Sequence, residues 1–200
     1  MASPAAATQP RPLRADARRN RAAILKAARQ VFGRQGPDAQ MDDVARKAGV
    51  GMGTVYRHFP TKEALIDALI ADRVEQITAF STEALEDPDP WHGLRRALWR
   101  GAELGARDRA LTGMFAERPA QMGAAHSQGR LTENTAELLR RAQAAGSVRP
   151  DLVAEDIRMV MCGVMSAMHK TGGPDGWKRH LRLALDGMAS GAAGEPLPDA

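Results

Sequence analysis

The chain has 200 residues, of which 44% are hydrophobic and 26% are charged, and this composition suits a globular protein with one domain or two small ones. Its single cysteine excludes a disulfide framework and a cysteine-based zinc site, and it fits the reducing cytoplasm. No apolar run reaches the roughly 18 residues that a membrane-spanning helix needs, so we expect no membrane partner.

The net charge of +4 is unevenly distributed along the chain. Residues 1–62 hold twelve Lys or Arg and four Asp, a net charge of +8, which leaves −4 for residues 63–200. A basic N-terminal third on an acidic remainder indicates that one end of the chain meets a polyanion such as nucleic acid. A basic surface that serves only solubility is the alternative.

Residues 1–17 are expected to form a disordered basic arm, because the first residues are Ala, Pro, Ser and Arg without periodicity. Such an arm can reach phosphates in a DNA-binding protein, or it can be a plain lead-in. From about Asp16 a helix is predicted to run to Arg34, and Gly36–Pro37 ends it. Its apolar residues fall at helical spacing: Ile24, Ala27, Ala28, Val31 and Phe32.

Residues 40–59 predict two short helices joined by a glycine turn. Asp42 and Asp43 suit the first turn of a helix that Gly49 ends. A second helix, at about residues 51–58, is so short that it needs to pack on its neighbours. This arrangement is typical of a helix-turn-helix, whose second helix enters the major groove of DNA. The residues expected inside are Val50, Val55 and Phe59.

Four residues of the second helix are predicted to face the bases. Gly53 permits close approach to DNA, and Thr54 and Arg57 reach base edges, where arginine grips guanine with two hydrogen bonds. Met52 is expected to touch a thymine methyl group. These residues would carry the choice of DNA sequence.

Three further residues are predicted to contact phosphates, namely Tyr56, His58 and Lys62. Such contacts position a protein on the duplex without reading its sequence. The alternatives are a packing role for Tyr56 and an ordinary surface role for His58.

A long helix is predicted to begin at Pro60 and Thr61, with Thr61 as its N-cap, and to continue to about Leu85. A helix of more than twenty residues links two layers of a protein. We therefore interpret it as the lever that joins the DNA-reading segment to a second core.

The remainder of the chain predicts further helices and no convincing strand. Breaks occur at residues 87–90, where the sequence reads Asp-Pro-Asp-Pro, and at residues 172–174. The fold class is therefore all-α with about nine helices, and residues 191–200 are expected to be a disordered tail. These helices are predicted at about 91–107, 108–118, 131–145, 151–170 and 175–189.

Catalytic and metal sites have little support in the sequence. The five histidines lack metal-ligand spacing, and residues 163–167 lack the second glycine of a nucleophile elbow. Residues 49–53 are glycine-rich but do not follow a strand or match the G-x-G-x-x-G spacing of a dinucleotide-binding loop. We expect no enzyme activity, no cofactor and no metal.

Residues 44–65, which read VARKAGVGMGTVYRHFPTKEAL, resemble the TetR family of one-component transcriptional regulators. The resemblance lies in the AGV turn, the TVYRHF recognition helix and the following Lys-Glu, and it extends over about residues 18–77. Two positions depart from the family pattern. Gln40 stands where threonine often caps the first short helix, and Met52 stands where a polar or basic residue is common.

The resemblance implies a homodimeric repressor that a small-molecule effector releases from a near-palindromic operator. Residues 18–77 would form the DNA-binding domain, and residues 78–190 the effector-binding and dimerisation domain. Residues 151–170 and 175–190 would pair with their mates in a four-helix bundle. One alternative is a DNA-binding factor that is controlled by a protein partner or by no ligand, and a helical-bundle enzyme is a weaker one.

The effector implied by this resemblance is expected to be largely apolar. The methionine-rich helix at 151–170 suits an adaptable pocket, and ordinary core or dimer packing is the alternative. The pocket residues predicted are Trp99, Met114, Phe115, Met122, His126, Met161 and Met165.

Overall fold

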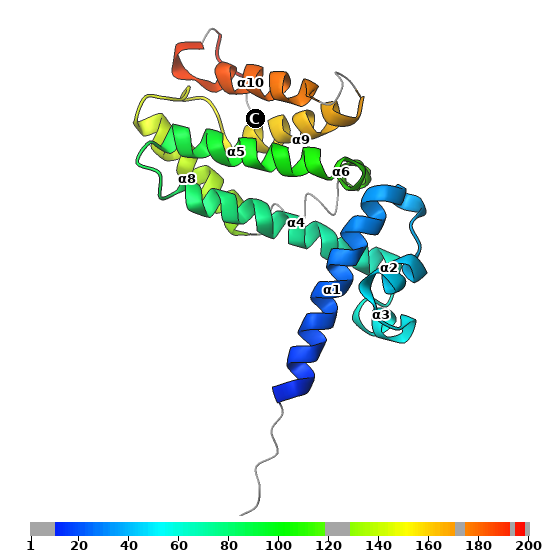
Figure 1. Ribbon diagram of the computed structural model, residues 1–200. Coiled ribbons are helices and arrows are strands. Elements are labelled where there is room, and N and C mark those ends of the chain that lie inside the picture. Colours follow the sequence, from blue (N-terminus) through cyan, green and yellow to red (C-terminus); the bar gives the residue numbers. More distant parts are fainter. Residues whose placement is uncertain (1–10, 119–128, 171–174, 193–194, 199–200) are drawn as a thin grey trace, which may run out of the picture. The chain divides into compact units, whose positions relative to one another are not determined.

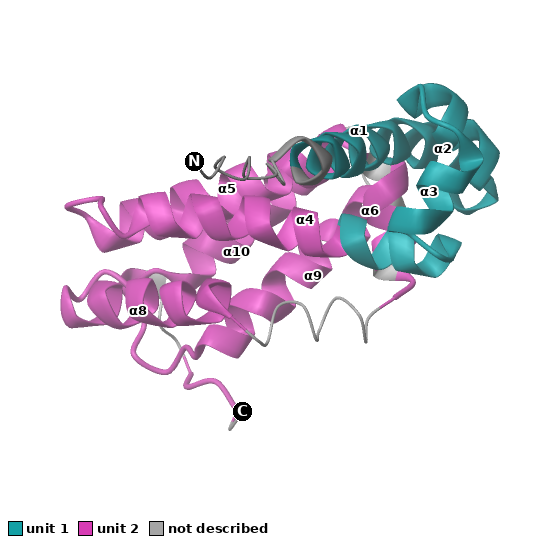
Figure 2. Cartoon of the chain, turned by 90° about the horizontal axis from the view of Figure 1, so that it is seen from below, with its two compact units in different colours: residues 1–69 teal, residues 70–200 magenta. Residues whose placement is uncertain are grey.

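The structure, a computed structural model, describes residues 11–118, 129–170, 175–192 and 195–198. Within these ranges the chain forms nine α-helices and no strand, apart from an isolated bridge between Val148 and Ala189 (Figure 1). This confirms the predicted all-α class and the predicted number of helices. The chain divides into two compact units, residues 1–69 and residues 70–200 (Figure 2).

The first unit begins with helix α1, Arg11–Gln35, which starts five residues earlier than predicted. Residues 11–17, which we assigned to a disordered arm, are therefore helical. Alanine and arginine are among the strongest helix formers, so a helix nucleated by the packed part of α1 extends through them. The helix ends at Gln35, and Gly36 follows it with a left-handed φ of 61°.

Two short helices, α2 (Met41–Ala48) and α3 (Met52–His58), pack on α1 and on each other. The Gln40 side chain does not cap α2 and instead donates to the carbonyl of Asp38 at 2.7 Å, as expected of a weak capping residue. The largest fully buried side chains of this unit are Ile24, Phe32, Val44, Leu65, Ile66 and Leu69.

Helix α4, Lys62–Ala84, begins one residue after the predicted N-cap. The Thr61 Oγ1 accepts a hydrogen bond from the backbone N–H of Ala64 at 3.0 Å, which confirms that Thr61 caps the helix. Residues of α4 belong to both compact units, because the division falls between Leu69 and Ile70.

The second unit contains five more described helices around an apolar core. The carboxylate of Asp89 caps the first of them by accepting from the N–H groups of Trp91 and His92. Within this unit α5 contacts α8 and α9, and α10 lies along α9 (Figure 1). The helices are α5 (Pro90–Arg107), α6 (Arg109–Ala116), α8 (Arg130–Ala144), α9 (Ala154–Lys170) and α10 (Gly176–Met188).

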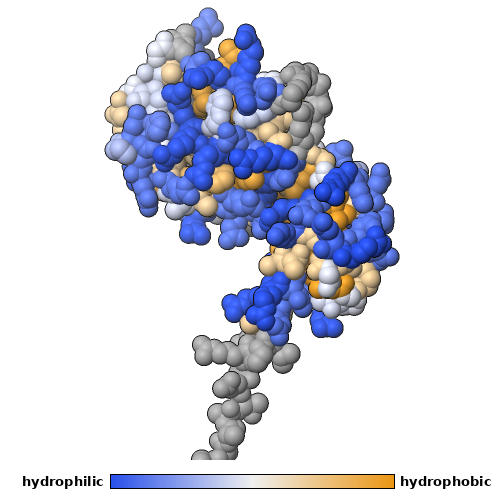
Figure 3. All heavy atoms as spheres, in the orientation of Figure 1, coloured by the Kyte–Doolittle hydropathy of each residue, from blue (hydrophilic) through white to orange (hydrophobic). Residues whose placement is uncertain are grey.

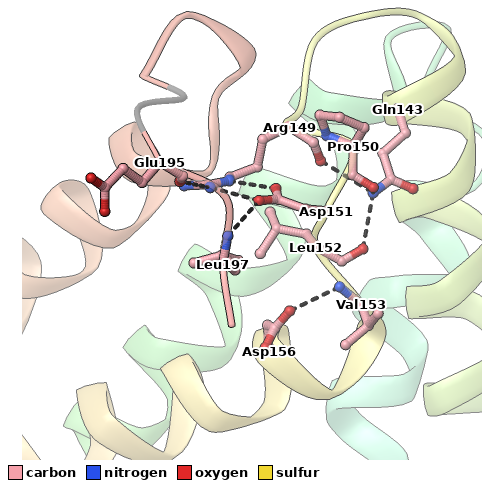
Figure 4. A network of polar contacts seen from close by, with 9 residues as sticks. All are labelled: Gln143, Arg149, Pro150, Asp151, Leu152, Val153, Asp156, Glu195 and Leu197. Atoms are coloured by element: carbon pink, nitrogen blue, oxygen red, sulfur yellow. Dashed lines mark hydrogen bonds and ion pairs between the residues drawn. The ribbon is translucent and has the colours of Figure 1, made fainter. Parts of the chain in front are cut away.

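Residues 195–197, which we assigned to a disordered tail, are held by hydrogen bonds to the segment before α9 (Figure 4). Arg149 and Asp151 form a two-pronged ion pair, with N–O distances of 2.6 and 2.7 Å. Arg149 also donates to the carbonyl of Glu195, and the N–H of Leu197 donates to Asp151. The hydrogen bonds from Arg149 and Leu197 hold the pKa of Asp151 well below its usual range.

Candidate nucleic-acid interface

The turn between α2 and α3 depends on one glycine. Gly49 ends α2 in the left-handed conformation, with φ 69° and ψ 30°. Its N–H and that of Val50 donate back to carbonyls of α2, including Val50 to Ala45 at 3.2 Å. A side chain at Gly49 would be strained in this conformation, so the residue sets the direction in which α3 leaves the turn.

Helix α3 has one buried side and one exposed side. Val55 is fully buried and Phe59, which follows the helix, is 3% exposed, in agreement with their predicted inward positions. Val50 was also expected inside, but it is half-buried because it lies at the rim of the turn. Tyr56 and Arg57 are exposed, and Tyr56 has 48% of its surface open although it is aromatic.

The other predicted DNA contacts on α3 lie within a few residues of Tyr56 and Arg57. Gly53 is exposed, and Met52, Thr54 and His58 are half-buried. The His58 ring is tilted against the Phe59 ring, with 6.4 Å between the centroids. Helix α3 therefore presents small, aromatic and basic side chains at one surface of the first unit.

Neither Gly51 nor Gly53 is required by the protein's own packing. Gly51 has a φ of −70°, Gly53 has no left-handed φ, and a Cβ at either position would meet no atom within 4 Å. A methyl group would fit at both positions in the isolated chain. Because no side chain projects from Gly51 or Gly53, another molecule can approach the backbone at the start of α3 closely.

Lys62 lies in a different environment from the exposed residues of α3. Its Nζ donates to the carbonyl of Pro37 at 2.5 Å and stands 5.8 Å from the centroid of the Phe32 ring. The ammonium therefore ties the start of α4 to the connection between α1 and α2. It has three donors, so this bond leaves donors for a phosphate.

Arg21 of α1 was not among the predicted contacts, yet it lies beside Phe59, the residue that follows α3. Its guanidinium carbon is 5.4 Å from the centroid of the Phe59 ring, within the range of a cation–π interaction. The sequence does place Arg21 at helical spacing from the apolar residues of α1. Counting charges along the chain does not use that spacing.

The predicted pocket residues are only partly brought together. Trp99, Met161 and Met165 pack against one core cluster of the second unit, where the Trp99 ring lies 5.6 Å from that of Trp177. Met114 and Phe115 are buried on α6. Met122 and His126 lie outside the described residues.

Methionine side chains fill the space beside two glycines of α5. A Cβ at Gly105 would stand 2.5 Å from the Sδ of Met165, and one at Gly101 would stand 3.9 Å from the Cε of Met161. The glycines thus make room for long, flexible side chains from α9.

A cavity of about 310 Å³ lies elsewhere, between the start of α9, the end of α10 and the bound tail. None of the five predicted pocket residues that the structure describes lines it. Its lining consists of Arg149, Leu152, Asp156, Met159, Val160, Ala184, Gly187, Met188 and Leu197.

Helices α9 and α10 also carry exposed apolar side chains. Met159 on α9 and Leu183 on α10 each have 62% of their surface open, and Cys162 is exposed between them in the sequence. On the same pair of helices the Nε2 of His180 lies 3.8 Å from where a Cβ of Gly163 would stand. The single chain thus leaves two large apolar side chains of this helix pair mostly uncovered.

Within the described ranges, no three His, Cys, Asp or Glu side chains gather closely enough to hold a metal ion. The described helices also include none with the length and apolarity that crossing a membrane requires.

Two family profiles match the chain. The profile described as bacterial regulatory proteins, tetR family, matches residues 24–69. The profile described as the C-terminal domain of SbtR-like transcriptional regulators matches residues 89–190. Together they cover α2, α3 and most of the second unit.

Known proteins agree with these profiles. TtgW of Pseudomonas putida, described as an uncharacterized HTH-type transcriptional regulator, is 39% identical over 85 residues, which cover 42% of this chain and 63% of TtgW, less than two thirds of its length. The HTH-type transcriptional regulator UidR of Escherichia coli is 30% identical over 146 residues, covering 70% of this chain and 74% of UidR. The TetR transcriptional regulator SCO0520 of Streptomyces coelicolor superposes with a TM-score of 0.63 at 31% identity, covering 84% and 98% of the two chains. The matched families and relatives are transcriptional regulators rather than enzymes.

Proposed function

Because the chain belongs to the tetR family of bacterial regulatory proteins, it is a helix-turn-helix transcriptional regulator, and we propose that α3 reads the bases of an operator. In this proposal Thr54 and Arg57 bond base edges, Met52 touches a thymine methyl group, and Gly53 admits the duplex. Residues 18–77 act as the DNA-binding domain.

The observation that carries the proposal is the surface of α3. Tyr56 and Arg57 are exposed beside a helix start that has no side chains at Gly51 and Gly53, although the protein's own packing leaves room for them. Tyr56, His58 and the remaining donors of Lys62 supply phosphate contacts, which fix the register of the protein on the duplex.

Selection of bound DNA from a random duplex pool tests base reading. Wild type should enrich one near-palindromic site, and Arg57→Ala should lose its preference at one base pair per half-site, at a cost of about 1–3 kcal/mol. Tyr56→Phe is the matched control in the same helix, since loss of a phosphate contact weakens all sequences and leaves the preference unchanged. Identical base preferences for wild type and Arg57→Ala would rule out base reading by Arg57.

The protein is further proposed to act as a homodimer through residues 151–170 and 175–190. Met159 and Leu183 support this arrangement, because a partner helix pair would cover side chains that a single chain leaves open. A two-fold dimer places two copies of α3 in successive major grooves, roughly 34–36 Å apart.

Release by an apolar effector completes the proposal and makes the protein a cytoplasmic repressor. Support comes from Met161 and Met165, whose side chains lie beside Gly101 and Gly105 of α5. Methionine side chains are flexible and can rearrange around a bound ligand. A ligand that binds better when the spacing of the two α3 helices is wrong must lower operator affinity, by linkage. A regulator controlled by a protein partner, or by no ligand, is the remaining alternative.

The effector is tested by adding small-molecule extract from cells to the complex with the selected operator. Release of the operator together with a rise in the melting temperature of the free protein supports a ligand-controlled repressor. Release by the protein fraction of the extract alone would favour control by a partner.

A further inference from the structure

Helix α1 carries a regular series of residues at alternating spacings of three and four. In the packed part of the helix the series consists of Leu25, Ala28 and Phe32, which are all buried. The same spacing continues toward the N-terminus with Arg21 and Arg18, and the sequence extends it to Arg14 and Arg11. Residues at this spacing share one face of a helix. One face of α1 is thus apolar in its second half and basic in its first.

The change from apolar to basic coincides with the end of protein packing. From residue 15 onward, where burial is described, Ile24 is the first buried residue of α1, and residues 15–23 are exposed or half-buried. The first turns of the helix extend beyond α2 and α3 (Figure 1), and this part of the surface is hydrophilic (Figure 3). The tetR family profile begins at residue 24, so it covers none of this segment.

Arg21 fixes the side toward which the basic residues lie. Its guanidinium stands 5.4 Å from the centroid of Phe59, the residue that follows α3. Arg18 precedes it by three residues and is exposed. The basic side of α1 therefore borders the end of the recognition segment, where Arg57 and His58 lie.

Asp16, the acidic residue in this part of α1, does not neutralise the face that carries Arg18 and Arg21. Residues 11–23 hold five arginines and one acid, Asp16, a net charge of +4. Asp16 pairs with Arg19, which is outside the three-four series, and both side chains are exposed. Arg18 and Arg21 thus keep their charge for a polyanion beside α3.

We propose that the arginine face of α1, defined here by Arg18 and Arg21, is a second DNA-contact surface that holds phosphates next to the bases that α3 reads. It rests on the proposed operator reading by α3 and adds to it a contact that is independent of sequence. The occupant is duplex DNA because the face is basic, hydrophilic and adjacent to the recognition helix. It raises affinity for all duplexes without changing which operator is preferred.

The test compares full-length Arg18→Gln with full-length Arg19→Gln, since the two variants lose the same charge at neighbouring exposed positions. Binding to a labelled random-sequence duplex of about 30 base pairs is followed by fluorescence anisotropy over a range of KCl concentrations. The magnitude of the salt slope should fall by about 0.9 for each copy of Arg18 that holds a phosphate. From about 50 to about 200 mM KCl, wild-type affinity should then drop about 3.5-fold more per copy than that of Arg18→Gln.

Arg19→Gln should retain the wild-type slope, and Arg18→Lys should restore it because it keeps the charge. Arg18→Gln should also select the same operator as wild type. Equal slopes for Arg18→Gln and Arg19→Gln, with wild type bound to DNA, would overturn this second surface and leave the role of α3 intact. A wild-type protein that binds no duplex at any salt concentration would overturn both.

Discussion

Single residues show most clearly where the demands of the fold end and those of function begin. Gly49 is required by the fold, because its left-handed conformation turns the chain from α2 into α3. Gly53 lies only four residues later, with no left-handed φ and open space beside it. The backbone conformation therefore requires glycine at position 49, whereas nothing within the protein requires it at position 53.

Gly53→Ala should separate stability from DNA binding. Alanine favours a helix over glycine, so the free energy of unfolding should rise by about 0.5–1 kcal/mol, while operator affinity falls because a methyl group meets the duplex. Urea denaturation and anisotropy titration measure the two quantities. The matched control is Gly33→Ala in α1, where a Cβ also meets no atom within 4 Å, and which should gain stability without losing affinity. Unchanged affinity in Gly53→Ala would remove the argument for close approach.

Glu137 provides a pH-dependent contribution to stability. Hydrogen bonds from Arg140 and then Arg141 lower its pKa from the ordinary 4.5 to about 2. Because the folded-state pKa lies below the unfolded one, the stabilisation is fully present above about pH 4.5 and is lost as the pH falls toward about 2.

Glu137→Gln should therefore be less stable than wild type near neutral pH, and the difference should shrink as the pH falls through that window. Urea denaturation at a series of pH values gives the difference directly. Glu133→Gln, on the exposed surface of the same helix, is the control. A difference that stays constant from about pH 6 to about pH 2.5 would contradict the assignment.

At the scale of elements, the junction of α4 and α5 is set by a close approach of two backbones. A Cβ on Gly93 would stand 2.6 Å from the carbonyl oxygen of Ala84 and 2.9 Å from the Cβ of Asp87. Asp87 in turn accepts from His92 at 2.9 Å, and this hydrogen bond is the main cause that lowers its pKa. The turn between the helices is therefore held by both packing and charge.

Gly93→Ala should destabilise the protein even though alanine is the better helix former. Forcing backbone atoms apart costs about 1–3 kcal/mol, which exceeds the gain of about 0.5–1 kcal/mol in helix propensity. Thermal and urea unfolding measure the balance, with Gly33→Ala again as the comparison in open space. A stabilised Gly93→Ala variant would show that α5 can move away from Ala84 at little cost.

The whole molecule consists of two compact units, each with buried side chains of its own, and helix α4 contributes residues to both. The second unit ends in a helix pair that leaves Met159 and Leu183 open. Fully burying an exposed leucine or methionine side chain stabilises an assembly by about 1.5–3 kcal/mol, which is an upper bound for these two partly covered residues. The proposed dimer accounts for these side chains without any change in the fold of a single chain.

Leu183→Glu should therefore give a folded monomer, because the residue is exposed in the single chain and buried only in the proposed dimer. Light scattering coupled to size exclusion measures the mass, and the thiol of Cys162 should react faster with a maleimide once the partner is lost. Tyr56→Glu, at another exposed hydrophobic residue, should keep the dimer mass. A dimer that survives Leu183→Glu with unchanged thiol reactivity would exclude this interface.

The sequence by itself determined the fold class, the helix-turn-helix and the family, because these depend on local chemistry. Helical periodicity, the left-handed glycine at 49 and the hydroxyl cap at Thr61 each act within a few residues, so they can be read along the chain. Base-reading residues on α3 could be nominated in the same way, from their spacing on a short helix.

Only the tertiary structure decided which side chains reach across the chain. Lys62 bonds the carbonyl of Pro37, Met165 fills the space beside Gly105, and Arg149 holds the tail at Glu195. The early start of α1 likewise depends on a helix nucleated by packing farther along. Contacts between residues distant in sequence leave no periodic pattern, because their geometry is set by how the helices pack. For the same reason, only the contact of Arg21 with Phe59 places the arginine face of α1 next to α3.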